Sequence, residues 1–310
     1  MLSKTKLYLL TGFLGAGKTT FLTNVLKDLE DKKISVIMNE FGKVGIDGSI
    51  IKKEGMELVE LNKGSIFCSC LKLSFVSALV EMADRNMEYV FVESSGLADP
   101  SNIDEFLEAV EVVKGDVYDY SGAICIVDGL NFLEQIGDVE TIERQLRFSH
   151  LVIISKVDLI HSEKLKEIKE KIREINNRAD IVESINGVID YDFLDRDLMI
   201  YDWGAYEDTS NSPENRPKTL TLTFEGELAK EKLTDFLNII KEDSYRIKGF
   251  FRLQDGWNQV DVVNRTIDYS PSDKGEDISE LVIISKIGAQ IIRPIFSAWE
   301  RIVGKEMKLR

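Results

Sequence analysis

Residues 12–20, Gly-Phe-Leu-Gly-Ala-Gly-Lys-Thr-Thr, carry the clearest chemical pattern in this sequence. The spacing G-x-x-x-x-G-K-T is typical of a phosphate-binding loop, in which backbone N–H groups surround an anionic phosphate. In this pattern Lys18 reaches the β- and γ-phosphates, and the Thr19 hydroxyl is a Mg²⁺ ligand. The predicted nucleotide contacts are Gly12, Gly15, Ala16, Gly17, Lys18, Thr19 and Thr20. The sequence therefore predicts a nucleoside triphosphate site.

A second apolar run ends in an acidic residue. Residues 89–92, Tyr-Val-Phe-Val, lead into Glu93, and Gly96 follows after two serines. Proteins with a phosphate-binding loop typically carry a second motif, in which a carboxylate stands at the carboxyl end of such a strand. This carboxylate holds Mg²⁺ directly or through water. The alternative is a surface acid that caps the strand. We predict a nucleotide contact at Gly96 and three catalytic residues, Lys18, Thr19 and Glu93, with no general base among them.

A third strand end carries a candidate base-recognition motif. Residues 155–158, Ser-Lys-Val-Asp, follow the N/T-K-x-D pattern of guanine-nucleotide binders, with serine in the first place. The Asp158 carboxylate accepts hydrogen bonds from guanine N1–H and from the exocyclic amine, a pair that adenine cannot supply. The Lys156 stem lies along the base. Serine at 155 weakens one support of the base site, but the motif still predicts a preference for GTP.

A short apolar run precedes each of the three motifs, and segments with a helical pattern alternate with these apolar runs. The predicted strands are 7–10, 34–38, 57–61, 89–92, 123–127 and 151–154. After the phosphate loop, one helical face carries Phe21, Leu22, Val25, Leu26 and Leu29. Nearly continuous apolar strands that alternate with helices indicate a parallel sheet covered on both faces. Ligands of such sheets bind beyond the carboxyl ends of the strands, where all three motifs fall.

The chain is predicted to form two domains. An α/β domain, a P-loop NTPase fold with a mostly parallel sheet, spans 1–205, and a linker spans 206–218. A smaller α+β domain spans 219–310 and begins with a half-buried strand at 219–224, where apolar and polar residues alternate. The rest of this domain is predicted as a helix at 233–240, strands at 245–253, 257–263 and 281–287, and a closing helix at 291–303.

Composition restricts the partners and the compartment. The chain has 310 residues and a formal net charge of −15, which argues against a nucleic-acid partner, because such a partner needs a basic face. No apolar run approaches membrane-spanning length, and no signal peptide is visible. The three cysteines make no disulfide framework. We therefore expect a cytoplasmic protein that binds neither nucleic acid nor membrane.

Four stretches together resemble the CobW-like family of metal-related GTPases, whose distant relatives include the hydrogenase and urease nickel-insertion GTPases. They are Gly12–Thr20, Asn39–Gly42, Glu93–Pro100 and the region Arg246–Trp257. The resemblance covers nearly the whole chain. It implies a protein that binds GTP and a divalent metal, and that hydrolyses GTP while it delivers the metal to a client. For this chain we expect Zn²⁺ or Co²⁺, a client metalloprotein or corrinoid protein, and a nucleotide-dependent homodimer.

The transition-metal ligands expected with this resemblance are Cys68, Cys70 and Glu40. The family signature Gly-Cys-x-Cys-Cys aligns with residues 64–68, Gly-Ser-Ile-Phe-Cys, so only its last cysteine is present, and Cys70 is additional. Two thiolates at i and i+2 of an extended segment point to the same side and bind one ion. Further ligands come from Glu40 by family analogy, from water or from a second subunit. Alternatively, the cysteines are semi-buried or redox-sensitive thiols.

Other residues limit this interpretation. Lys43 stands where relatives carry an acid, which removes one ligand from the loop at 39–55. His150 and His161 lie at the ends of elements and are expected at the surface. Cys125 lies within a predicted core strand and is expected only to pack.

The leading hypothesis is a slow GTPase that acts as a metallochaperone or activator of a metal- or corrinoid-dependent client. One rival is a nucleotide-gated module that holds a partner protein without metal transfer, and whose complex persists when hydrolysis is blocked. Another rival is a small-molecule kinase, which needs an acceptor pocket and a catalytic base. The motifs at 93–96 and 155–158 favour a switch GTPase over the kinase.

Overall fold

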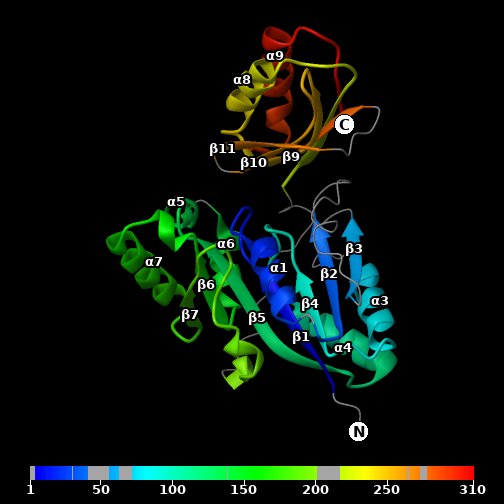
Figure 1. The fold of residues 1–310 in the computed structure, drawn as a ribbon, viewed down its shortest axis with the longest axis vertical. Helices are drawn as coiled ribbons and strands as arrows, with labels where there is room; N and C mark the ends of the chain where they lie inside the picture. The colour runs from blue at the N-terminus through cyan, green and yellow to red at the C-terminus, as the bar shows by residue number, and fades with distance from the viewer. Residues whose placement is uncertain are drawn as a thin grey trace. The chain divides into compact units, whose positions relative to one another are not determined.

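The structure, a computed structural model, divides the chain into two compact units, which are described separately (Figure 1). Unit 1 spans Met1–Asn215 and unit 2 spans Arg216–Arg310. The residues that the structure describes are 4–29, 31–40, 56–62, 72–137, 139–200, 217–263, 265–272 and 278–310. Residues 41–55 of the loop at 39–55 lie outside them, as does the predicted linker apart from its last two positions. The predicted domain boundaries therefore stay predictions.

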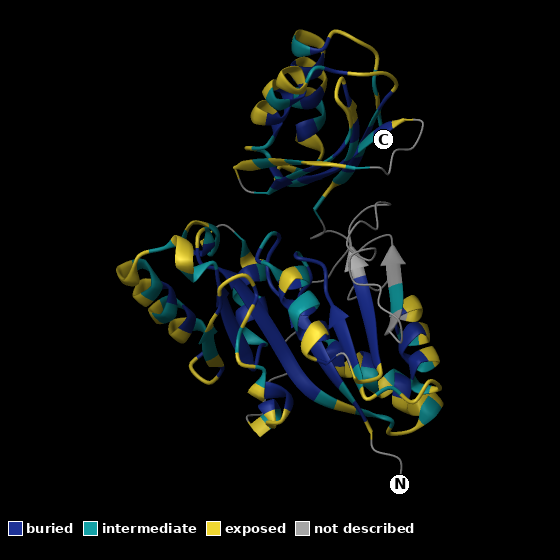
Figure 2. Ribbon diagram, viewed as in Figure 1, coloured by how far each residue is buried: buried dark blue, intermediate teal, exposed yellow. Residues whose placement is uncertain are grey.

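Unit 1 is built on a sheet of seven described strands, and every pairing in it is parallel. The strands are β1 (Thr5–Thr11), β2 (Ile34–Glu40), β3 (Met56–Asn62), β4 (Tyr89–Glu93), β5 (Tyr118–Asp128), β6 (Leu151–Ser155) and β7 (Asp180–Glu183). Their order is β3-β2-β4-β1-β5-β6-β7, so the first strand of the chain is central. The described central strands are largely buried (Figure 2). This sheet confirms the predicted fold class.

Helices cover both faces of this sheet. Successive side chains of a strand point to opposite sides. Tyr8 and Leu10 of β1 therefore share a core cluster with α1 and Phe193, whereas Leu7 and Leu9 share another with α3 and α4. Burial on both sides explains why these strands are almost continuously apolar. The helices are α1 (Lys18–Asp28), α3 (Lys72–Ala83), α4 (Ile103–Lys114), α5 (Phe132–Gln135), α6 (Glu140–Arg147) and α7 (Ser162–Ile175), with 3₁₀ turns η1 (Val157–Leu159), η2 (Asp192–Leu194) and η3 (Leu198–Ile200).

The predicted strands of unit 1 are confirmed, but α4, β7 and the four-residue helix α5 were not predicted. The apolar face predicted for α1 is buried. Helix α4 was missed, although Ile103, Phe106 and Val110, its buried residues, follow helical spacing. Strand β7 was missed because it has only four residues and none of them is buried, so it carries little hydrophobic pattern.

Unit 2 has an antiparallel sheet with two helices on one face (Figure 1). Its elements are β8 (Thr219–Phe224), α8 (Lys230–Ile240), β9 (Ser244–Leu253), β10 (Gly256–Val263), β11 (Thr266–Pro271), β12 (Ser279–Ser285), η4 (Gly288–Ile291), α9 (Ile292–Ile302) and β13 (Lys308–Leu309). Strand β8 alternates between half-buried and buried residues, as predicted. The Trp299 ring lies 5.3 Å from Phe224 and 5.0 Å from Phe236, between centroids, and so joins both helices to the sheet.

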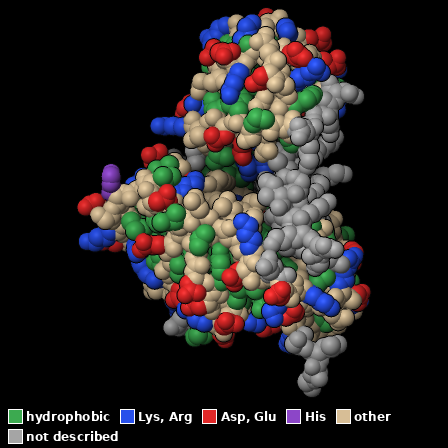
Figure 3. Space-filling model, in the orientation of Figure 1, with side chains coloured by type: hydrophobic (Ala, Val, Ile, Leu, Met, Phe, Trp, Pro, Cys, Tyr) green, Lys and Arg blue, Asp and Glu red, His purple; other side chains and the backbone are tan. Residues whose placement is uncertain are grey.

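None of the described helices is both long and apolar enough to cross a membrane. On the face shown in Figure 3, acidic and basic side chains are interspersed over the described parts of both units. No broad basic area is visible among those residues on this face, whereas a nucleic-acid surface needs one.

Candidate active site

The phosphate loop connects the central strand to the first helix. Its residues 12–17 lie directly between β1 and α1, and its last three residues, 18–20, begin α1. Three of its glycines have positive φ: 132° at Gly12, 76° at Gly15 and 104° at Gly17. At Gly12 a Cβ would lie 2.3 Å from the Ile126 carbonyl oxygen, so only glycine fits there. Because α1 begins at the end of these residues, its N-terminus adds a partial positive charge to the loop, as in anion-binding sites.

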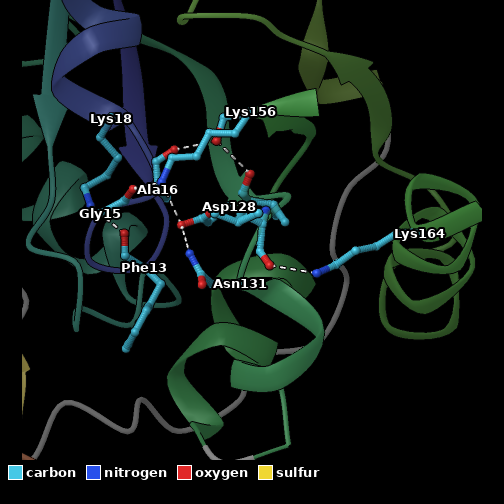
Figure 4. Close-up of polar contacts among 11 residues, drawn as sticks. Phe13, Gly15, Ala16, Lys18, Asp128, Asn131, Lys156 and Lys164 are labelled. Carbon is cyan, nitrogen blue, oxygen red and sulfur yellow. Dashed lines mark hydrogen bonds and ion pairs between the residues drawn. The ribbon is translucent and has the colours of Figure 1, made fainter. Parts of the chain in front are cut away.

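The Lys18 ammonium lies over this loop. Its Nζ donates hydrogen bonds to the carbonyl oxygens of Gly12, at 2.8 Å, and Phe13, at 3.2 Å (Figure 4). The residue is only 8% exposed although it carries a charge. The contacts hold the ammonium beside the first turn of α1. Its charge therefore acts together with that of the helix terminus on an anionic ligand.

Thr19 and Glu93, the two predicted Mg²⁺ ligands, are brought into contact. The Thr19 Oγ1 hydroxyl donates a hydrogen bond of 2.9 Å to Glu93 Oε1, although the residues are 74 apart in the chain. The parallel pairing of β1 with β4 sets Glu93 beside Leu10, two residues before the loop. Glu93 is 6% exposed. A hydroxyl and a carboxylate side by side are hard oxygen donors, so the residues present fit a Mg²⁺ ion.

Helix α6 anchors the loop that follows Glu93. Arg144 Nε donates to Asp99 Oδ2 at 2.6 Å, and both side chains are largely buried. The neighbouring Gln145 donates through Nε2 to the carbonyl oxygens of Gly96, at 3.2 Å, and Ala98, at 3.0 Å. These contacts were not predicted, because nothing in local spacing links residues about 45 positions apart. They fix the backbone at Gly96, the predicted nucleotide contact.

The candidate base motif is tied to the phosphate loop by two side chains. Ser155 Oγ lies 2.7 Å from the Ala16 carbonyl oxygen, and Lys156 Nζ donates to the Gly15 carbonyl oxygen at 3.0 Å (Figure 4). The serine was expected to weaken a support of this site, yet its hydroxyl contacts the loop directly. Asp158 is exposed and lies in η1, immediately beyond β6. The structure therefore brings the first and third motifs together.

Asp128 also contacts the candidate base motif, and it was not predicted. It ends β5, between the strands that carry the phosphate loop and the base motif. Its Oδ2 accepts a hydrogen bond of 2.8 Å from Lys156 Nζ. The signal that identified Glu93, a carboxylate at the tip of an apolar strand, is also present at Asp128.

The predicted transition-metal ligands lie outside what the structure describes. Cys68 and Cys70 fall in the stretch 63–71, and of Glu40 only the backbone at the end of β2 is described. Within the described parts of the chain, no group of three or more His, Cys, Asp or Glu side chains is arranged to hold a metal ion. The three ligands stay predictions.

Single cysteine and histidine predictions had different outcomes. Cys125 is buried in β5, as predicted, and burial raises the pKa of its thiol to about 12. The surface position predicted for His150 is wrong, because the residue is 7% exposed. Its Nδ1 accepts a hydrogen bond of 3.0 Å from the Ala123 N–H, which couples β6 to β5. His161 is exposed just before α7, as predicted.

Comparison with known proteins assigns both parts of the chain. Residues 6–183 match the family described as CobW/HypB/UreG, nucleotide-binding domain, and residues 218–298 match the cobalamin synthesis protein cobW C-terminal domain. The zinc chaperone YjiA of Escherichia coli is 32% identical over 192 residues, with 60% of this chain and 59% of that protein covered. The zinc-regulated GTPase metalloprotein activator 1 of Saccharomyces cerevisiae is 31% identical over 252 residues, with 70% and 58% covered. The chain spans about three fifths of the length of these relatives.

Among solved structures, the Zn(II)-bound YjiA GTPase of E. coli is similar with a TM-score of 0.48 and 21% identity, over 97% of this chain and 99% of that chain. The match to the nucleotide-binding domain covers more than half of the chain and contains the phosphate loop, Glu93 and the base motif. This chain therefore belongs to the CobW/HypB/UreG family.

Proposed function

We propose that this protein binds GTP with Mg²⁺ and hydrolyses the β–γ phosphoanhydride slowly. The observation that carries the proposal is the 2.9 Å contact between Thr19 and Glu93, next to the loop that holds Lys18. It supports one site in which two oxygen ligands and an ammonium face the same phosphates. Such a constellation is what phosphoryl transfer requires, because its catalysis is mostly positioning and charge stabilisation.

Each residue has a definite role in this proposal. Lys18 and the backbone N–H groups of the loop bind the β- and γ-phosphates and stabilise the charge that develops on the transferred group. Thr19 and Glu93 hold Mg²⁺, which neutralises phosphate charge when bound. Gly96 presents backbone close to the nucleotide. No general base is assigned among the described residues, and the isolated chain is therefore expected to turn over slowly, with a client or a second copy completing the site.

The base motif supports guanine as the base. Asp158 accepts the two guanine hydrogen bonds, and Lys156 lies along the base. The contact of Lys156 with the phosphate loop supports this role, because it joins base and phosphate recognition.

The biological role that we propose is delivery of a transition metal, Zn²⁺ or Co²⁺, to a client metalloprotein or corrinoid protein. The support is the family membership and relatives named as zinc chaperones and as a zinc-regulated GTPase metalloprotein activator. Cys68, Cys70 and Glu40 are the proposed ligands of the transported metal. A GTP-dependent homodimer in the cytoplasm is part of the same proposal.

Phosphate release from purified protein tests the enzymatic part. We expect Mg²⁺-dependent release from GTP that is faster than release from ATP. Thr19→Ala is expected to lower kcat by on the order of 100-fold. Thr23→Ala is the matched control, because Thr23 lies one helical turn further along α1 and its hydroxyl donates to the Thr19 carbonyl oxygen, at 2.8 Å. Faster turnover of ATP would contradict the base assignment, and a phosphorylated small molecule in place of free phosphate would indicate the kinase.

Titration with Co²⁺ tests the metal part separately. Reduced wild-type protein is expected to give an intense thiolate charge-transfer band, and the Cys68→Ser/Cys70→Ser variant is expected to lose it. Cys125→Ala is the control and should keep the band, because Cys125 is buried in β5. Absence of the band in the wild type would rule out the proposed thiolate site.

A further inference from the structure

The Asp128 carboxylate is the centre of a buried hydrogen-bond network at the tip of β5. Its side chain is 1% exposed. Oδ2 accepts from Lys156 Nζ and from Asn131 Nδ2, each at 2.8 Å, and Oδ1 accepts from the Leu130 N–H at 3.0 Å (Figure 4). A buried carboxylate needs such donors, and a cationic donor makes the strongest of these bonds.

The Lys156 ammonium is held by two acceptors, one in the phosphate loop and one at the end of β5. Its ammonium donates to Asp128 and also to the Gly15 carbonyl oxygen, at 3.0 Å. Two of its three N–H bonds therefore have fixed acceptors, and the third has no acceptor among the residues that the structure describes. A lysine side chain loses much rotamer freedom when it is fixed in this way. The protein has already restricted this side chain before any nucleotide arrives, which is preorganisation.

The segment that carries Asp128 is itself fixed against β6 and α7. The Gly129 N–H donates to the Ser155 carbonyl oxygen at 3.0 Å. A Cβ at Gly129 would lie 2.7 Å from that same oxygen, so the approach requires glycine. Lys164 of α7 donates to the Leu130 carbonyl oxygen at 2.8 Å (Figure 4). The Asp128 carboxylate therefore has a fixed position, and its hydrogen bond to Lys156 fixes the position of the Lys156 ammonium.

We propose that Asp128 is a positioning residue for guanine-nucleotide binding. It holds the Lys156 ammonium against Gly15, so that the base motif and the phosphate loop form one site before the nucleotide binds. The inference rests on the proposed GTP-binding function. Because the Asp128 carboxylate neutralises the ammonium, the Lys156–Asp128 pair carries no net charge and contributes little to nucleotide binding through charge. Lys156 acts instead through its stem and its remaining N–H bond.

A double-mutant cycle with GDP tests this role. Asp128→Asn keeps the shape of the side chain and removes its charge. Lys156→Met keeps the stem and removes the ammonium. We expect Asp128→Asn to raise the GDP Kd about tenfold, equal to 1.4 kcal/mol, at physiological salt. In the Lys156→Met background the same change is expected to have no further effect, since Asp128 acts only through Lys156. At saturating GTP, kcat should stay within about threefold while KM rises.

Asp261→Asn is the matched control. Asp261 forms an ion pair with Arg246 in unit 2 and is more exposed than Asp128, with Arg246 Nε donating to Oδ1 at 3.0 Å and Nη2 to Oδ2 at 2.8 Å. Its substitution should leave the GDP Kd unchanged. If Asp128→Asn fails to fold, Asn131→Ala replaces it, because it removes one donor from Asp128 and keeps the carboxylate. We then expect about threefold weaker binding, which again disappears in the Lys156→Met background.

Each other outcome contradicts the inference. Additive losses in the double variant would mean that Asp128 supports only the fold around 128–131. Tighter GDP binding by Asp128→Asn would mean that the carboxylate acts through repulsion of the phosphates. An unchanged Kd would mean that it has no role in binding. Failure of the wild type to bind GDP would instead contradict the proposed function, so the two failures are distinguishable.

Discussion

At the scale of single residues, the Cys125 thiol is expected to be unreactive in the folded protein. Burial raises the pKa of the Cys125 thiol to about 12, so at pH 8 it stays protonated and inaccessible. We predict that an alkylating reagent at pH 8 leaves Cys125 unlabelled in native protein and labels it in denatured protein. The measurement is mass spectrometry after alkylation with and without denaturant. Native labelling of a Cys68→Ser/Cys70→Ser variant would contradict this prediction.

Residue chemistry could be predicted wherever it lies within a short motif. Lys18 and Thr19 stand at fixed positions after the phosphate-loop glycines, so spacing alone identified them. The ion pairs Asp128–Lys156 and Asp99–Arg144 could not be predicted, because their members are 28 and 45 residues apart. Such contacts depend on which strands are neighbours, and the sequence carries no spacing rule for that.

At the scale of elements, the connection between β1 and α1 depends on glycine at position 12. In Gly12→Ala the new Cβ would lie 2.3 Å from the Ile126 carbonyl oxygen, within the central sheet, at a φ of 132°. We predict that it lowers the free energy of unfolding by more than about 3 kcal/mol, from overpacking and backbone strain together. Gly115→Ala is the control: its φ is 77° and nothing lies within 4 Å, so about 1 kcal/mol is expected. Denaturant unfolding measures both, and equal losses would contradict the argument.

The anchor between α6 and the loop after Glu93 is also testable. Arg144→Met leaves Asp99 buried without the guanidinium, so we predict a loss of about 3–5 kcal/mol in the free energy of unfolding. Adding Asp99→Asn should recover part of that loss. Arg147→Met on the same helix breaks an exposed pair with Glu143 and should cost less than about 1 kcal/mol. Similar losses for Arg144→Met and Arg147→Met in urea unfolding would count against a buried anchor.

At the scale of the whole molecule, unit 2 has its own hydrophobic core. The buried residues of its core cluster all lie between positions 220 and 303, with Trp299 and three phenylalanine rings in contact. We predict that a fragment spanning 217–310 folds alone with one cooperative thermal transition. Its unfolding enthalpy should be near 0.7 kcal/mol per residue, the usual value for globular domains. A fragment with no transition in calorimetry would show that its core needs unit 1.

The division into an α/β and an α+β part could be predicted, because hydrophobic periodicity changes between the two parts of the sequence. Continuous apolar runs indicated the parallel sheet, and the alternation in β8 indicated a sheet with one covered face. Strand β7 and helix α4 were missed, the first because it is short and not buried. The metal ligands Cys68 and Cys70 depend on the family resemblance, since they lie outside the described residues.

The central claim is that the strand ends form one guanine-nucleotide site, and exchange of the base tests it most directly. Xanthine carries a carbonyl where guanine carries its exocyclic amine. An asparagine at 158 accepts from N1–H and donates to that carbonyl, whereas Asp158 suits guanine only. We predict that the wild type binds GDP about 100-fold more tightly than xanthosine diphosphate, and that Asp158→Asn reverses this order. Unchanged preference in the variant would contradict the proposed base site.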